Sequence, residues 1–168
     1  MSRVAFGQQP VFVALMQARG LDYRSDPIVQ SLRRVGVGAV MDLSVAALSR
    51  RATRTDIDAA LAGNPVWVVV LGPERPEALL PAVDLVRQTM EEPDAVEFDL
   101  LELPATRLQV APIALEATLQ EALDALARTG AEALYVVARE AAFGAPPTYG
   151  VITRAAVDTH YQYVAGRS

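Results

Sequence analysis

The chain has 168 residues and a net charge of -5 at pH 7, and 52% of its residues are hydrophobic. This length allows one compact domain or two small repeats, and the negative charge argues against nonspecific binding to nucleic acid. The sequence has no cysteine, which excludes disulfides and thiolate metal sites, and its one histidine, His160, argues against a zinc site with three or four ligands. No apolar run approaches the roughly 20 residues of a membrane span, so the fragment is expected to be soluble.

The charges are unevenly distributed along the chain. Eight arginines fall in the first third, whereas the segment 91–102 is acidic. This pattern is compatible with a surface that faces an anionic membrane or an acidic partner, and equally with an ordinary solvated surface. The eight residues are Arg3, Arg19, Arg24, Arg33, Arg34, Arg50, Arg51 and Arg54.

Residues 1–36 are predicted to form an N-terminal arm with two short helices. The first covers residues 10–18, and the second begins at Asp26-Pro27 and ends at Gly36. The second helix is too small to bury its own apolar stripe, so the arm must lie on another part of the protein. The stripe consists of Ile28, Leu32 and Val35.

Residues 37–90 are predicted to contain a strand, a helix, two strands and a second helix. Thr53 or Thr55 caps the first helix, and the continuous apolar run over residues 66–71 predicts a strand that is buried on both faces. The other elements are short strands over residues 45–48 and 78–80 and a helix that begins at Pro81.

An acidic connector, residues 91–104, contains enough apolar residues for part of it to be packed. Residues 105–168 then repeat the earlier order of elements. Thr118 and Glu121 form a capping box, and Gly130 ends the helix that follows. The remaining elements are strands over residues 108–113, 133–138 and 149–152 and a helix capped by Thr153.

The two halves can be overlaid on one another. Each half alone is too small to close a core, so the two should pack through their sheets. The predicted fold class is α+β, with two β-α-β-β-α repeats related by a pseudo-twofold axis. The overlay places Thr53 on Thr118, Asp56 on Glu121, Leu61 on Leu126, Trp67 on Tyr135, Pro81 on Thr153 and Asp84 on Ala156.

Two units of this pattern, the second closing with Gly150-Val151-Ile152-Thr153-Arg154, resemble a tandem pair of cystathionine-β-synthase (CBS) domains over about residues 37–164. The resemblance implies a regulatory module, without catalytic residues, that forms homodimers through its helices. The last helix carries Val157, Tyr161 and Val164 at a spacing suited to such a contact.

The arm is similar to the segment that follows the last membrane helix in bacterial CLC chloride channels and transporters. This similarity implies a cytoplasmic regulatory region whose partner is the membrane domain of a longer protein. The alternative is a free-standing CBS pair that senses adenosine nucleotides and acts on a soluble partner. The segments that carry the similarity are Phe6-Gly7-Gln8-Gln9, residues 18–23, residues 32–37 and Val40-Met41-Asp42.

The resemblance also implies a nucleotide site between the repeats, where a Thr or Ser and an Asp three residues later hold the ribose. The second half keeps Thr153 but has Ala156 at the Asp position, whereas the first keeps Asp84 but has Pro81 at the Thr position. Arg154 is placed to meet a phosphate. Because neither site is complete, the expectation is an empty or degenerate cleft that requires no cofactor and has ATP, ADP or AMP as its candidate ligands.

Each of these residues also has a purely structural interpretation. Thr153 is a plausible helix cap, the Asp84 carboxylate is favoured by the dipole of its helix, and Arg154 suits a solvated surface. His160 is expected at the surface or in an interface, and a pH-sensing role is the alternative. The sequence contains no candidate catalytic or metal site.

Overall fold

The computed structural model describes residues 27–138 and 148–165. Two helices precede the repeats, α2 (Pro27–Arg34) and α3 (Val37–Val40). The predicted helix over residues 10–18 lies outside the described residues. No helix in the described part of the chain is long and apolar enough to cross a membrane.

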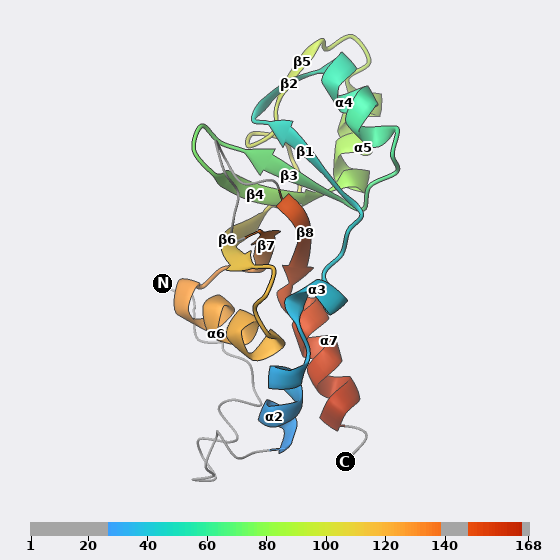
Figure 1. Ribbon diagram of the computed structural model, residues 1–168. Helices are drawn as coiled ribbons and strands as arrows, with labels where there is room; N and C mark the ends of the chain where they lie inside the picture. The colour runs from blue at the N-terminus through green and yellow to red at the C-terminus, as the bar shows by residue number, and fades with distance from the viewer. Residues whose placement is uncertain (1–26, 139–147, 166–168) are drawn as a thin grey trace.

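Both predicted repeats are present, in the predicted order of elements (Figure 1). The first consists of β1 (Val45–Ser49), α4 (Arg54–Leu61), β3 (Trp67–Leu71), β4 (Pro76–Pro81) and α5 (Ala82–Glu91). The second consists of β6 (Leu108–Ala114), α6 (Leu119–Thr129), β7 (Ala133–Val137), β8 (Thr148–Thr153) and α7 (Arg154–Ala165). A small antiparallel ribbon, β2 (Arg51–Thr53) with β5 (Glu97–Asp99), is added to the first repeat.

Local signals in the sequence account for the helix boundaries. Thr53 and Thr118 each accept a hydrogen bond from the third helical residue in complete capping boxes. Gly130 ends α6 in the left-handed conformation, with a φ of 72° that favours glycine. Asn64 has a φ of 52° in the turn after α4.

The strands form one six-stranded sheet in the order β1-β3-β4-β6-β7-β8. Within each repeat the first two strands are parallel and the last two antiparallel. Only two residue pairs, Ala78 with Gln109 and Leu79 with Leu108, join β4 to β6. The sheet is therefore two three-stranded halves with a narrow hydrogen-bonded link.

Strand register defines how the repeats correspond. If the ends of β4 and β8 are matched, Trp67 corresponds to Ala133 and Val69 to Tyr135. The overlay of Trp67 on Tyr135 predicted from sequence was therefore wrong by two residues, which is one step along the same face of the strand. The corresponding rows are Val45–Trp67–Pro81 in the first half and Val110–Ala133–Thr153 in the second.

Three apolar clusters make up the core. One lies between the first sheet and its helices, one between the second sheet and its helices, and one between the two sheets. The third cluster confirms that the repeats face each other through their sheets. Its fully buried members are Val69, Leu79, Ala133, Tyr135 and Val151.

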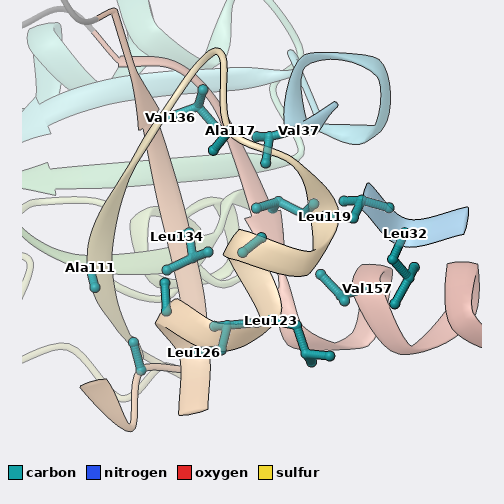
Figure 2. Close-up of a cluster of buried hydrophobic side chains, with 14 residues drawn as sticks. Leu32, Val37, Ala111, Ala117, Leu119, Leu123, Leu126, Leu134, Val136 and Val157 are labelled. Carbon is teal, nitrogen blue, oxygen red and sulfur yellow. The ribbon is translucent and has the colours of Figure 1, made fainter. Parts of the chain in front are cut away.

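The arm packs on the second repeat, as Figure 1 shows for α2 beside α6 and α7. Leu32 and Val37 are fully buried in the cluster of that repeat (Figure 2). The Val37 N–H donates to the Ala117 carbonyl at 2.8 Å, and the Leu119 N–H donates to the Val35 carbonyl at 2.9 Å. Leu32 of the predicted stripe is thus buried and Val35 is half-buried against the same cluster, and residues 37–42, which were assigned to the first repeat, contact the second.

The last helix faces inward where the sequence suggested a dimer contact. Val157 is fully buried among side chains of α6 and the arm, and Tyr161 packs at the edge of the same cluster. The side chain of Val164 lies outside the described residues. Val157 is therefore unavailable to a second subunit, because the arm supplies the apolar partner that the sequence alone could not assign.

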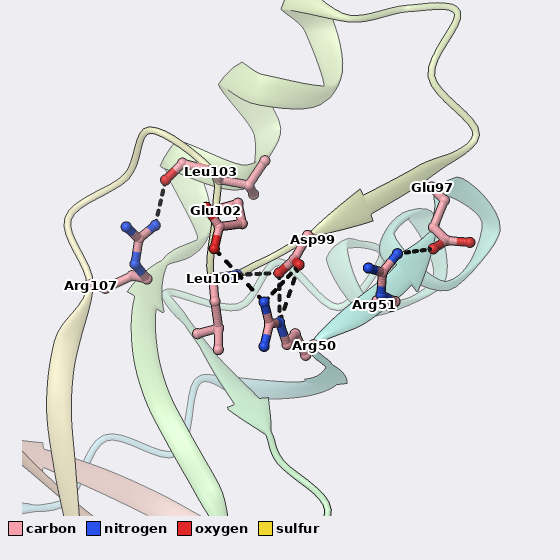
Figure 3. Close-up of polar contacts among 8 residues, drawn as sticks. All are labelled: Arg50, Arg51, Glu97, Asp99, Leu101, Glu102, Leu103 and Arg107. Carbon is pink, nitrogen blue, oxygen red and sulfur yellow. Dashed lines mark hydrogen bonds and ion pairs between the residues drawn. The ribbon is translucent and has the colours of Figure 1, made fainter.

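The acidic connector is anchored on the first repeat, which confirms that part of it is packed. Phe98, Leu100 and Leu103 are buried in the cluster of that repeat. The Arg50 guanidinium binds the Asp99 carboxylate through two nitrogens, at 2.9 and 3.0 Å, and holds the pKa of Asp99 below its usual value (Figure 3). Through such contacts, acidic residues of the connector face the arginines at the junction between β1 and β2.

Candidate nucleotide pocket at the start of helix α7

Thr153 ends β8 and caps α7, as its position in the sequence predicted. Its hydroxyl oxygen accepts a hydrogen bond from the Ala156 N–H at 3.1 Å. Because Thr153 shares a row of the sheet with Ala133, its side chain lies on the face that meets the first repeat. The cap thus stands at the border between the repeats.

Arg154 turns its guanidinium back onto α6. Nη2 donates to the carbonyls of Leu126, at 3.4 Å, and Ala131, at 3.3 Å, near the C-terminal end of that helix. A cation there is favoured by the helix dipole. The Nε and Nη1 groups are buried without a hydrogen-bond partner in the described part of the chain, so the side chain keeps unused donors.

Asp158 lies one turn further along α7. Burial raises the pKa of its carboxyl group, and the positive charge of Arg154 opposes that shift. One carboxylate oxygen is buried and unpaired within the described residues. Asp158 therefore interacts electrostatically with the guanidinium, but one of its oxygens has no hydrogen bond among the described residues.

Thr153 and Arg154 line one pocket of about 280 Å³. Trp67 contributes from the first repeat, so the pocket spans the boundary between the two halves. Trp67 was expected to be a core residue, and its position at this boundary was not predicted from the sequence. The one indication in the sequence is that Trp67 is the first residue of its strand. The lining residues are Trp67, Leu108, Glu132, Thr153, Arg154 and Ala155.

Asp84, the third candidate, is not part of this pocket. Its carboxylate accepts a hydrogen bond from the Thr106 N–H at 3.1 Å and pairs with Arg87 at 3.3 Å. Asp84 therefore ties α5 to the residues that lead into β6. Pro81 precedes it as the cap residue of α5 and makes no side-chain capping bond, so the first repeat offers no hydroxyl at the matching position.

The polar groups at Thr153 suit a weak contact with a polar ligand. A ribose would find a hydroxyl and a helix N-terminus, but Ala156 stands where the CBS pattern has Asp, and the carboxylate that lines the pocket is that of Glu132, outside α7. His160 is half-buried on α7, and its role as a pH sensor stays a prediction. Among the described residues, no group of three or more His, Cys, Asp or Glu side chains is arranged to hold a metal ion.

The chain resembles known proteins in its fold. No protein-family model and no curated protein matches the chain. Among solved structures, the CBS domain of a putative transporter from Clostridium difficile 630 superposes with a TM-score of 0.52 at 16% identity, covering 82% of this chain and 99% of that one. The CBS domain of a bacterial CNNM/CorC family Mg²⁺ transporter in complex with ATP gives a TM-score of 0.50 at 18% identity, over 80% of this chain and 92% of that one.

At sequence identities this low, the structural matches show a shared fold and not a shared function. Both matched structures are CBS domains, and both are covered almost completely. The likeness to CLC proteins inferred from the arm finds no counterpart among them. The chain has the fold of a CBS-domain pair.

Proposed function

We propose that this chain is a non-catalytic regulatory module that acts on a membrane transport protein. The observation that carries the proposal is the docking of the arm on the second repeat. The segment that leads to the N-terminus pairs with β8 at Val151, two residues before Thr153. A change in the packing of the second repeat is therefore transmitted directly to the arm.

The parent protein is a CLC-type chloride channel or transporter, as the sequence of the arm implies. Both matched structures are described as CBS domains of transporters, one of them for Mg²⁺, and this supports a transport protein as the partner without favouring chloride. A free-standing sensor is the second candidate. The genome separates them, because an upstream reading frame with ten or so apolar helices favours the first and a stop codon before Met1 the second.

Nucleotide binding at Thr153 is weak. The matched CNNM/CorC domain was solved with ATP, but here the ribose carboxylate is replaced by Ala156 and Arg154 is directed to the end of α6. A charge-assisted hydrogen bond contributes about 1.5–3 kcal/mol, so its absence costs at least tenfold in affinity. Calorimetric titration with ATP, ADP and AMP tests this, and micromolar binding of any of them would contradict it.

The module forms a homodimer through α5. Val83, Val86 and Met90 are spaced three and four residues apart on this helix, and they are 60%, 38% and 75% exposed. The corresponding residues of α7 are Ala155, Asp158 and Gln162, which offer no apolar stripe. This contact takes the place of the one predicted at Val157.

A further inference from the structure

A second cleft lies away from Thr153, where the two halves of the sheet separate. β4 and β6 are paired only at Ala78–Gln109 and Leu79–Leu108, and beyond these pairs the β3–β4 turn stands apart from β6. The cleft between them has a volume of about 600 Å³. The turn residues 73–77 form one wall, and residues 110–112 with Tyr135 form the other.

Tyr135 lies at the floor of this cleft with an unused hydroxyl group. Its side chain is 95% buried, since only 5% is exposed, and the hydroxyl makes no hydrogen bond within the described part of the chain. Burial raises the pKa of the phenol, so at neutral pH the group is an uncharged donor. The hydroxyl oxygen is not among the buried side-chain atoms that lack a partner, so it is accessible from the cleft that Tyr135 lines, and a ligand in the cleft can accept its hydrogen bond.

The duplication supplies an internal control for this residue. The register makes Val69 the counterpart of Tyr135, and Val69 is fully buried in the same cluster between the sheets. An aliphatic side chain therefore satisfies the packing at this position. The hydroxyl of Tyr135 is an addition that the fold does not need.

The walls and the mouth of the cleft indicate which ligand fits. Pro73, Pro76 and Pro112 contribute flat apolar surfaces on both sides. The charged residues are all exposed on the turn and carry both signs, Glu74 and Glu77 against Arg75. Because the charges at the mouth have both signs, they favour neither a cationic nor an anionic ligand. The Tyr135 hydroxyl can donate a hydrogen bond to an acceptor atom of the ligand.

We propose that the cleft between the β3–β4 turn and β6 binds a neutral, planar heteroaromatic molecule. Its ring lies between the proline surfaces, and a ring nitrogen or carbonyl oxygen accepts a hydrogen bond from the Tyr135 hydroxyl. This site is separate from the pocket at Thr153 and needs neither a ribose nor a phosphate.

The test uses two probes of equal shape. 1-Methylbenzimidazole has a ring nitrogen that accepts a hydrogen bond, and 1-methylindole has a C–H group in its place. At pH 8 both are neutral. Each is titrated into the ¹⁵N-labelled chain, and amide shifts are followed at Val110, Ala111 and Tyr135. Wild-type protein should bind the benzimidazole about two- to tenfold more tightly, as expected for one hydrogen bond of 0.5–1.5 kcal/mol.

Tyr135→Phe should remove this preference and leave binding of 1-methylindole unchanged. Tyr161→Phe, the same change on α7, should keep the preference. Equal affinities of the two probes for wild-type protein would overturn the proposal, as would a preference that survives in Tyr135→Phe. Shifts centred on Trp67 and Thr153 in wild-type protein would also overturn it, and that observation needs no variant.

Discussion

Asp42 and Val151 pair through two backbone hydrogen bonds, although 109 positions separate them. The Asp42 N–H donates to the Val151 carbonyl at 2.7 Å, and the Val151 N–H donates to the Asp42 carbonyl at 3.0 Å. This pair fastens the segment between the arm and β1 to β8, much as the two pairs between β4 and β6 fasten the repeats to each other. The last strand of each repeat, β4 or β8, is therefore hydrogen-bonded to residues at the start of the other repeat. The backbone hydrogen bonds thus follow the pseudo-twofold symmetry.

Gly150 permits this close approach. A Cβ atom at this position would lie 2.7 Å from the Asp42 carbonyl oxygen and 3.1 Å from the Met41 sulfur. Gly150→Ala should therefore lower the free energy of unfolding by about 1–3 kcal/mol, a typical cost of forced overpacking. Urea unfolding measures it. Gly63→Ala is the control, because nothing lies within 4 Å of its Cβ position, and its effect should stay within about 0.5 kcal/mol.

Leu32 is the anchor of α2. Leu32→Ala removes a fully buried side chain and should cost about 2–5 kcal/mol. Amide exchange should also accelerate at Val37, whose N–H donates to Ala117 in the docked arm. A stable variant with unchanged exchange at Val37 would show that the arm is held without this side chain.

Arg54 binds the connector to the first repeat. Its guanidinium donates to the carbonyls of Ala95 at 3.0 Å and Glu92 at 2.6 Å, and it lies 5.4 Å from the centre of the Phe98 ring. Arg54→Ala should cost about 1.5–3 kcal/mol in unfolding free energy, as for hydrogen bonds from a charged donor. Arg87→Ala removes an exposed arginine whose ion pair with Asp84 spans only three residues of α5, and it should cost less than about 1 kcal/mol. Equal costs would mean that the Arg54 contacts add nothing to the connector.

Asp158 should make stability depend on pH. Its folded pKa is raised by burial, so the folded state binds the proton more tightly, and the ionised carboxylate destabilises the fold at pH values above that pKa. Asp158→Asn should therefore be more stable than wild type at pH 7. The difference should shrink as the pH falls through the folded pKa and vanish below the unfolded value of about 3.9. Thermal unfolding of the variant and of wild type at pH 7 and pH 3 measures the two stability differences. A variant that is less stable than wild type at pH 7 would contradict the prediction.

The apolar stripe on α5 predicts the behaviour in solution. The chain should sediment as a dimer at tens of micromolar, and Val86→Glu should weaken the dimer at least tenfold, because it places a charge at the centre of the contact. Val96→Glu changes a more exposed valine, 77% against 38%, on the connector and should leave the dimer intact. A monomeric wild-type chain contradicts the prediction directly.

The sequence by itself determined those features that depend on a few neighbouring residues. The capping boxes at Thr53 and Thr118 and the glycine that ends α6 act within three or four positions, so the pattern predicts the helices and, through their repetition, the duplicated fold.

Contacts between distant residues became known from the three-dimensional fold alone. The assignment of Val157 to a dimer contact was wrong because the arm covers that face, and the sheet register moved the counterpart of Tyr135 from Trp67 to Val69. Thr153 and Arg154 share a pocket, whereas Asp84 is bound to Thr106, just before β6. Such contacts join residues that are distant in sequence, and local propensity contains no information about which apolar face will cover which other.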